Sequence, residues 1–389
     1  MKVVVAHNRY SSAQPSGENS IVDTEIAQLR EAGVDVVPFL RSSDEIASLS
    51  APRKLALAGS PIYGRGAQRA LSELIEAERP DVLHLHNPYP FLSPAVVRTA
   101  QRHGVPVAQT VHNFRHVCVN ALYFRDGRLC HDCRDKAFGL PGVVHGCYRG
   151  SRPQSLIMAT TLAAHRGTWR RVDRFIALTG RIEAHLREYG VAPERITVKP
   201  NSIPDPGAHD RVGEGFVFVG RLSREKGVEL LLDAWRRHEV GRLGRLVVVG
   251  DGEQRDLVAA AAAERDDVEY AGPVPHEEIA ERLRSAACLV STSVCEDVLP
   301  TVVIEALANA RAVLTTDLGG PPHMIGDAGA AVAPDADSVA AGLERMSVAA
   351  RGLAETARKR YLTHFSPDVV VSRQLEIYRE MIETGVEGV

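Results

Sequence analysis

The chain has 389 residues, and its length and composition are those of a soluble globular protein with room for two domains. Its formal net charge of -3 gives no indication of a nucleic-acid partner, and no run approaches the ~20 apolar residues that cross a bilayer. The start, Met1 to His7, is too short for a signal peptide and predicts a strand, so we expect a cytoplasmic protein, with peripheral contact at the inner membrane face left open.

The first half alternates short apolar runs with longer amphipathic stretches, such as Ile21–Glu31 and Arg181–Tyr189. Continuous Val, Ile and Leu character in the short runs is typical of parallel strands that helices cover on both faces. The predicted strands are Lys2–Val5, Val34–Leu40, Asp81–His86, Val105–Val111, Arg174–Leu178 and Ile196–Lys199.

A second series of the same kind follows Pro200–Gly207, which holds three prolines and a glycine and predicts a linker. We therefore expect an α/β protein of two Rossmann-like domains, 1–203 and 204–366, and a last helix, 367–389, that packs back on the first. Ligands bind such sheets beyond the carboxyl ends of their strands. The predicted strands here are Phe216–Val219, Arg245–Val249, Val268–Tyr270, Cys288–Ser291, Ala312–Thr315 and Ala330–Val332, with helices at Val228–Arg237 and Gln254–Glu264.

Two loops of the second half have the composition of a phosphate site. The loop Gly220–Gly227 follows a strand and opens a helix, and two of its cations, Arg221 and Lys226, are candidates for binding phosphate. Fixed positive charge beside a helix N-terminus suits a diphosphate, although a solvated basic loop would have the same composition. The turn Gly250–Gly252 also follows a strand, and its glycines permit close backbone approach to a ligand.

A third loop, Ser293–Glu305, adds two candidate carboxylates, Asp297 and Glu305. Asp297 precedes the helix that we expect over Pro300–Ala310, and Glu305 lies inside it. Glu305 follows Thr301 by four residues and so shares its face, where a carboxylate can accept hydrogen bonds from a ribose diol. The alternative is a capping residue and an ordinary surface glutamate.

These loops, in this order and spacing, resemble glycosyltransferase family 4 of the GT-B fold, in which two Rossmann-like domains face each other across a deep cleft. That family carries a Gly-Arg…Lys-Gly phosphate loop and two acidic residues separated by seven others, here Asp297 and Glu305. The first acid is normally Glu, and the neighbouring Glu296 would break the spacing. The resemblance implies a retaining transferase that needs no catalytic metal and takes a UDP-sugar, or else a GDP- or dTDP-sugar.

The resemblance also implies roles for individual residues. Glu305 would bind the ribose hydroxyls and Asp297 the hydroxyls of the sugar ring. Arg221 and Lys226 would neutralise the leaving diphosphate, which makes a catalytic metal unnecessary. The further donor-binding residues that it implies are Gly17, Gly220, Gly250, Gly252, Val274, Leu299, Pro300 and Thr301.

In the first half, the resemblance points to the acceptor side. His112 ends a predicted strand, at a position where the family has a histidine near the transferring sugar. His86 ends an earlier strand, and the family's glycine-rich loop corresponds to the segment around Ser16 and Gly17. A purely structural role remains open for each of these residues. The acceptor-side candidates are Ser16, Glu18, His86 and Asn113.

An insertion at about 114–150 holds four cysteines, of which Cys130 and Cys133 form a C-x2-C pair. Four thiolates can close a tetrahedral zinc site and pin an irregular segment. Such a zinc would be structural, and unligated thiols packing in a loop are the alternative. The four candidate ligands are Cys118, Cys130, Cys133 and Cys147.

The predicted reaction moves a sugar from a nucleotide sugar to a hydroxyl of a glycan, a lipid-linked glycan or a small metabolite. The alternatives from other classes are a nucleotide-sugar epimerase and a non-catalytic nucleotide-sugar-binding protein. A dinucleotide oxidoreductase is disfavoured, because no G-x-G-x-x-G follows the first strand.

Overall fold

The computed structural model describes residues 1–12, 16–50, 57, 59–207 and 211–386, and the chain divides into two compact units. Unit 1 comprises Met1–Tyr123, Cys130–Ser202 and Val370–Val389, and unit 2 comprises Phe124–Leu129 and Ile203–Val369. Each unit contains a six-stranded parallel sheet covered by helices, so the predicted α/β class with two Rossmann-like sheets is confirmed.

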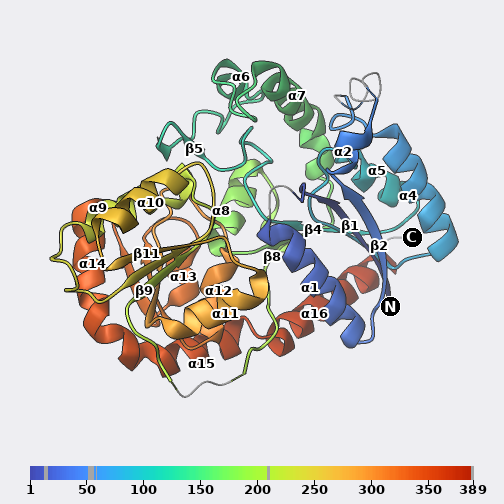
Figure 1. Cartoon of the computed structure of the whole chain (residues 1–389). Helices are drawn as coiled ribbons and strands as arrows, with labels where there is room; N and C mark the ends of the chain where they lie inside the picture. Colours follow the sequence, from blue (N-terminus) through green and yellow to red (C-terminus); the bar gives the residue numbers. More distant parts are fainter. Residues whose placement is uncertain (13–15, 51–56, 58, 208–210, 387–389) are drawn as a thin grey trace. The chain divides into compact units, whose positions relative to one another are not determined.

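The sheet of unit 1 has the strand order β2-β1-β3-β4-β7-β8 (Figure 1). Its strands are β1 (Lys2–Arg9), β2 (Asp35–Ser42), β3 (Val82–Leu85), β4 (Val107–Val111), β7 (Arg174–Ala177) and β8 (Ile196–Val198). Its helices are α1 (Gly17–Glu31), α2 (Glu45–Ser48), α4 (Arg65–Glu78), α5 (Ala95–Arg102), α6 (Leu140–Val144), α7 (Arg152–Trp169) and α8 (Gly180–Tyr189), with a 3-10 turn at Pro193–Arg195.

The sheet of unit 2 has the order β11-β10-β9-β12-β13-β14, and a short hairpin of β5 (Phe124–Arg125) and β6 (Arg128–Leu129) belongs to the same unit. Its strands are β9 (Phe216–Val219), β10 (Leu246–Val249), β11 (Val268–Gly272), β12 (Cys288–Ser291), β13 (Ala312–Thr316) and β14 (Gly329–Val332). Its helices are α9 (Val228–Trp235), α10 (Arg255–Glu264), α11 (His276–Ser285), α12 (Thr301–Ala308), α13 (Pro321–Ile325), α14 (Ala336–Ala349) and α15 (Ala354–His364), with 3-10 turns at Arg224–Lys226 and Ala350–Leu353.

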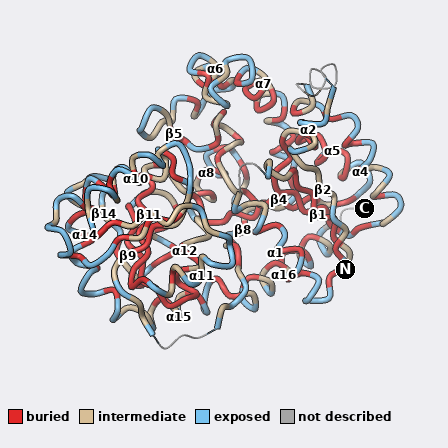
Figure 2. The backbone as a smooth tube through the Cα atoms, viewed as in Figure 1, coloured by how far each residue is buried: buried red, intermediate tan, exposed pale blue. Residues whose placement is uncertain are grey.

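The last helix, α16 (Pro367–Val386), completes the core of unit 1. It lies beside α1 (Figure 1), and residues of both helices belong to one buried apolar cluster with residues of β1. Figure 2 shows buried stretches along both helices. Such burial is the main favourable term in folding. The residues that meet there include Val3 and Val5 of β1, Val22, Ile26 and Leu29 of α1, and Ile377, Tyr378 and Met381 of α16.

The sequence misplaced some element ends. Strand β2 runs two residues beyond the predicted Leu40. Helix α12 stops at Ala308 instead of Ala310, because Ala310 adopts a left-handed backbone with φ of 58° that a helix cannot continue. Among the described helices, none combines the length and apolar character needed to cross a bilayer.

Candidate functional site

In each sheet the strand order reverses at one point, and ligands of open parallel sheets bind at the carboxyl ends of the strands there. In unit 2 this point lies between β9 and β12, and the predicted loops Gly220–Gly227 and Ser293–Glu305 follow these two strands. In unit 1 it lies between β1 and β3. The loops that follow the strands at this reversal in unit 2 are therefore the loops in which the sequence predicts the phosphate-binding and acidic residues.

Glycines let the loops of unit 2 approach closely. Gly227 has φ of 67°, and a Cβ there would lie 1.9 Å from the carbonyl oxygen of Thr292. A Cβ on Gly250 would lie 1.9 Å from the carbonyl oxygen of Gly220. The loops after β9, β10 and β12 are thus packed backbone against backbone, and a side chain at either glycine would separate them.

Lys226 and Asp297 meet in unit 2 as a direct ion pair. Ser293 Oγ donates a hydrogen bond of 3.2 Å to the same carboxylate oxygen, Asp297 Oδ2. Burial opposes the charge of Lys226, but the negative charge of Asp297 outweighs it and raises the pKa of the ammonium. The structure therefore brings together the predicted cation and the predicted first acid, and the cation stays charged at neutral pH.

Arg221 and Glu305 lie on the same unit with different exposure. The Arg221 side chain is 63% exposed, and its Nη2 lies 4.0 Å from Glu225 Oε1. Glu305 is only 14% exposed, with its Oε1 3.9 Å from His276 Nε2. Burial raises the pKa of Glu305, and His276 opposes this shift. The Arg221 side chain is therefore exposed to solvent, whereas Glu305 is mostly buried on α12.

The other predicted donor-binding residues outside the glycine loops lie at the start of α12 and just before α11. Pro300 is the extended residue that precedes α12, Thr301 is its first residue, and Leu299 is buried beside them. Val274 is half-buried in the loop between β11 and α11. The first N–H groups of α12 lack partners within the helix, as at any helix start, and suit an anion.

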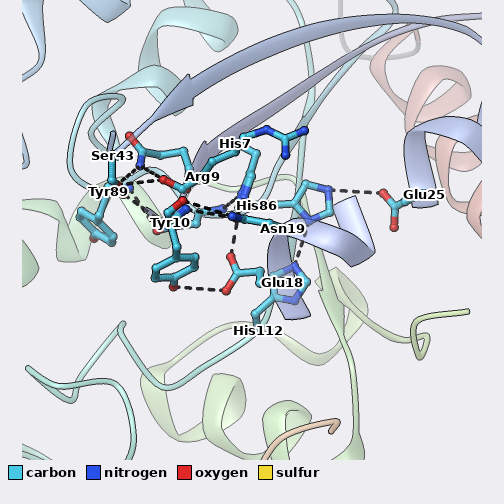
Figure 3. Close-up of polar contacts among 12 residues, drawn as sticks. His7, Arg9, Tyr10, Glu18, Asn19, Glu25, Ser43, His86, Tyr89 and His112 are labelled. Atoms are coloured by element: carbon cyan, nitrogen blue, oxygen red, sulfur yellow. Dashed lines mark hydrogen bonds and ion pairs between the residues drawn. The ribbon is translucent and has the colours of Figure 1, made fainter. Parts of the chain in front are cut away.

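Unit 1 contains a buried polar network (Figure 3). It includes His86, His112 and Lys199, which follow the ends of strands β3, β4 and β8. At its centre is Glu25 of α1, whose Oε2 lies 3.4 Å from Lys199 Nζ and whose Oε1 lies 3.0 Å from His84 Nδ1 and 3.3 Å from His86 Nε2. Tyr378 of α16 reaches His84 Nδ1 at 2.7 Å. Burial alone would raise the pKa of Glu25, but Lys199 and the histidines hold it well below its usual range.

The network extends to His112, because His86 Nδ1 lies 2.9 Å from His112 Nε2 and the two rings are stacked. In this pair one nitrogen must donate and the other accept, so the two tautomers are coupled. Burial, and then the neighbouring His86, holds the pKa of His112 well below its usual value. The predicted acceptor-side residue His86 and the predicted catalytic residue His112 are thus in contact, and His112 is neutral at pH 7.

Helix α1 supplies the remaining predicted residues. Ser16 precedes it without a capping hydrogen bond, and Gly17 is its exposed first residue. Glu18 accepts a hydrogen bond of 3.3 Å from Tyr10 Oη, and burial raises its pKa to about 7. Asn113 Oδ1 accepts 3.1 Å from the backbone N–H of Arg115. A cavity of about 30 Å³ in unit 1 is lined by Glu18, His86, His112, Asn113, Arg115 and Trp169, among others.

Acid should weaken unit 1 more than unit 2. Burial lowers the pKa of His7 to about 3 and that of His84 to about 4, against about 6.5 in the unfolded chain. The unfolded state then binds more protons between pH 6.5 and 4, so stability contributed above pH 6.5 is lost as the pH falls through this window. Hydrogen exchange at pH 7.5 and 5 should show protection falling in β1, β3 and β4. Equal losses in β9, β10 and β12 would contradict this origin.

The four cysteines are neighbours without forming a closed ligand set. Cys118 and Cys133 are buried, and Cys130 and Cys147 are half-buried. Burial raises the pKa of Cys133 to about 11, with the other three thiols as minor causes. Within the described ranges, only Glu25, His84 and His86 bring three potential ligand atoms within 4.8 Å of one another, so ligation by the cysteines requires local rearrangement.

A metal ion is disfavoured at the group that does meet this distance, because the ammonium of Lys199 already neutralises Glu25. The sequence analysis did not predict this network, although one residue of it, Glu25, is recognisable in the sequence. Glu25 lies on the apolar face of α1, between Ile21 and Leu29, and is buried there. A carboxylate in an apolar stripe requires a partner, but the sequence does not say which.

Two family models match the chain: residues 16–202 match the glycosyl transferase 4-like domain, and residues 213–347 match glycosyl transferases group 1. D-inositol 3-phosphate glycosyltransferase 1 of Catenulispora acidiphila is 27% identical over 337 residues, covering 78% of this chain and 73% of that protein. Alpha-maltose-1-phosphate synthase of Mycolicibacterium smegmatis is 26% identical, covering 98% of this chain and 100% of the relative.

Solved structures share the fold at low identity. Sucrose-phosphate synthase from Thermosynechococcus elongatus has a TM-score of 0.72 at 17% identity and covers 98% of this chain and 99% of its own. Anabaena HepE in complex with UDP-glucose has a TM-score of 0.66 at 13% identity, with 98% of this chain and 100% of its own covered. At such identity the likeness establishes the fold alone.

Proposed function

The chain belongs to the group 1 glycosyltransferases and has their GT-B fold, and from this premise we propose that it transfers a sugar from a UDP-sugar to an acceptor hydroxyl with retention at the anomeric carbon. HepE was solved with UDP-glucose, which supports a UDP-sugar as the first donor to test. GDP- and dTDP-sugars are the alternatives. The relatives named for inositol 3-phosphate and maltose 1-phosphate support a polyhydroxylated acceptor, whether glycan, lipid-linked glycan or small molecule.

The observation that carries this proposal is the Lys226–Asp297 pair at the strand-order reversal of unit 2. A charged ammonium, the exposed Arg221 and the start of α12 supply three sources of positive potential on one unit. Such an arrangement suits the two phosphates of a nucleotide sugar. Asp297, which already accepts two hydrogen-bond donors, has the chemistry to bind sugar hydroxyls as well.

In the proposed reaction the bond between the anomeric carbon and the phosphate oxygen breaks, and its electron pair leaves with the diphosphate. Lys226 and Arg221 stabilise the charge that develops there. The acceptor oxygen forms the new bond on the same face, and its proton passes to the departing phosphate oxygen. We propose that this step uses no metal ion and that any zinc on the four cysteines is structural, since four thiolates leave no open coordination position.

Calorimetry with UDP, GDP and dTDP tests the donor, and a donor-hydrolysis assay separates an enzyme from a non-catalytic binding protein. Glu305→Gln should weaken binding of the preferred nucleotide by about 10- to 100-fold, the effect of losing hydrogen bonds to a charged group. Because the pKa of Glu305 is raised, wild-type affinity should fall on acidification sooner than for an ordinary glutamate, and the variant should lack this fall.

Glu278→Gln, on an exposed residue of α11, is the matched control and should leave affinity unchanged. Equal affinity of Glu305→Gln and wild type for every nucleotide would remove Glu305 from the donor site. Absence of nucleotide binding and of hydrolysis in the wild type would overturn the proposed function itself.

A further inference from the structure

Arg115 is a cation of unit 1 that lines a cavity and has no ion-pair partner among the described residues. Its guanidinium lies over the rings of Tyr89 and Tyr148, with its carbon 5.7 and 5.3 Å from their centroids. Burial opposes its charge, yet Tyr148, Tyr10 and Tyr89 keep its pKa above the usual value. Among the residues that the structure describes, no carboxylate forms an ion pair with it, and its buried Nε has no hydrogen-bond acceptor.

Glu18 lines the same cavity but does not neutralise Arg115. Burial raises the pKa of Glu18 and the positive charge of Arg115 opposes that rise, so the two groups are close, although their N and O atoms are too far apart for an ion pair. Glu18 Oε1 is buried without a hydrogen-bond donor, and it lies 3.9 Å from Nδ1 of His7, whose low pKa leaves that ring uncharged at neutral pH. Two opposite charges with unused bonding capacity therefore face one small space.

The size of the cavity limits what enters it. A water-sized group needs roughly 10–15 Å³, so a cavity of about 30 Å³ admits the oxygens of one functional group and not a whole sugar ring. The guanidinium lies over the two tyrosine rings, and along its Nε edge the buried Nε atom has no hydrogen-bond partner. That edge of an arginine fits carboxylate and phosphate oxygens through two parallel hydrogen bonds.

We propose that the cavity formed by Arg115, Glu18, Tyr89 and Trp169 binds a carboxylate or phosphate ester carried by the acceptor, so that the enzyme selects an anionic acceptor. Only the identification of the ligand as an acceptor rests on the proposed transfer reaction. The oxyanion pairs with Arg115 along its Nε edge. Glu18 bonds a neighbouring hydroxyl or, when protonated, donates to the oxyanion.

The test is calorimetric titration of the whole chain with D-glucose, D-glucuronate, glucose 6-phosphate and inorganic phosphate, with and without saturating UDP to occupy the donor site. Wild type should bind at least one anionic probe at least tenfold more tightly than glucose. Arg115→Met should weaken that binding by about 10- to 100-fold, and Arg115→Lys should lose an intermediate amount, because an ammonium cannot form the paired bonds.

Arg149→Met is the matched control, because Arg149 is exposed and also lies 5.3 Å from the ring centroid of Tyr148. It should change the affinity for the anionic probe less than twofold. The stronger of glucuronate and glucose 6-phosphate identifies the anionic group as carboxylate or phosphate. Equal affinity for glucose and both anionic probes, or an unchanged affinity in folded Arg115→Met and Arg115→Lys, would overturn the proposal while leaving UDP binding intact.

Discussion

Replacing Lys226 with alanine should lower kcat by about 100- to 1000-fold, the range seen when one preorganised group that stabilises developing charge is lost. Donor affinity should fall much less, because Arg221 and the start of α12 still attract the diphosphate of the bound donor. The ammonium matters most when negative charge develops on the departing oxygen. Steady-state kinetics for kcat and calorimetry for donor binding separate the two effects.

Arg224→Ala is the matched control for this prediction, since Arg224 is an exposed cation on the same loop, two residues away. It should leave kcat close to wild type. Asp297→Asn and Glu296→Gln, measured in parallel, decide which acid acts with Lys226. The ion pair favours Asp297, so Asp297→Asn should have the larger effect. Wild-type kcat in Lys226→Ala would exclude the assigned role.

Replacing Glu25 with alanine should lower the free energy of unfolding by about 3–5 kcal/mol, because it leaves the buried ammonium of Lys199 without its counter-charge. The Lys199 side chain is only 2% exposed, so solvent cannot take the place of the carboxylate. The variant also removes the carboxylate beside His84 and His86. Urea-induced unfolding, followed by a probe in unit 1, measures the loss.

Two comparisons isolate the cause of this destabilisation. Glu73→Ala breaks the exposed pair of Glu73 with Arg69, whose side chains are 64% and 85% exposed, and should change stability little. The double replacement Glu25→Leu with Lys199→Met removes both charges and should recover most of the loss. If the loss of stability in the double variant equals the sum of the losses in Glu25→Leu and in Lys199→Met, an unpaired buried charge is not the cause.

The Glu25 network also has a consequence for chemistry. It places a carboxylate behind His86, which in turn contacts His112. Glu25 Oε1 and His86 Nε2 lie 3.3 Å apart without the alignment of a hydrogen bond, so the ionised carboxylate favours the His86 tautomer with its proton on Nε2 through electrostatic attraction. His86 Nδ1 would then accept from His112 Nε2, leaving His112 Nδ1 as the unprotonated nitrogen. The neutral state of His112 follows from the same burial.

The sequence by itself determined the strands, most helices and the positions of the loops that hold the predicted site residues. These features are local, because apolar runs, helical periodicity and turn residues act over a few positions. The loop Gly220–Gly227 and the acids Asp297 and Glu305 were therefore visible in the sequence. The family resemblance rested on the same local signals, and the loop to which it assigned Lys226 and Arg221 follows β9 in unit 2.

Only the tertiary structure decided which of these groups meet. Lys226 and Asp297 are 71 positions apart, Lys199 and Glu25 are 174 apart, and Tyr378 and His84 are 294 apart. Contacts of this kind follow from the order of strands in each sheet and from the return of α16 to unit 1. Neither the strand order nor the return of α16 can be recognised in a short stretch of sequence. A crossover connection constrains where its two ends lie in space and not which residues lie between them. Burial, which neutralises His112 and raises the pKa of Glu305, is likewise a property of the packed unit and not of the chain segment.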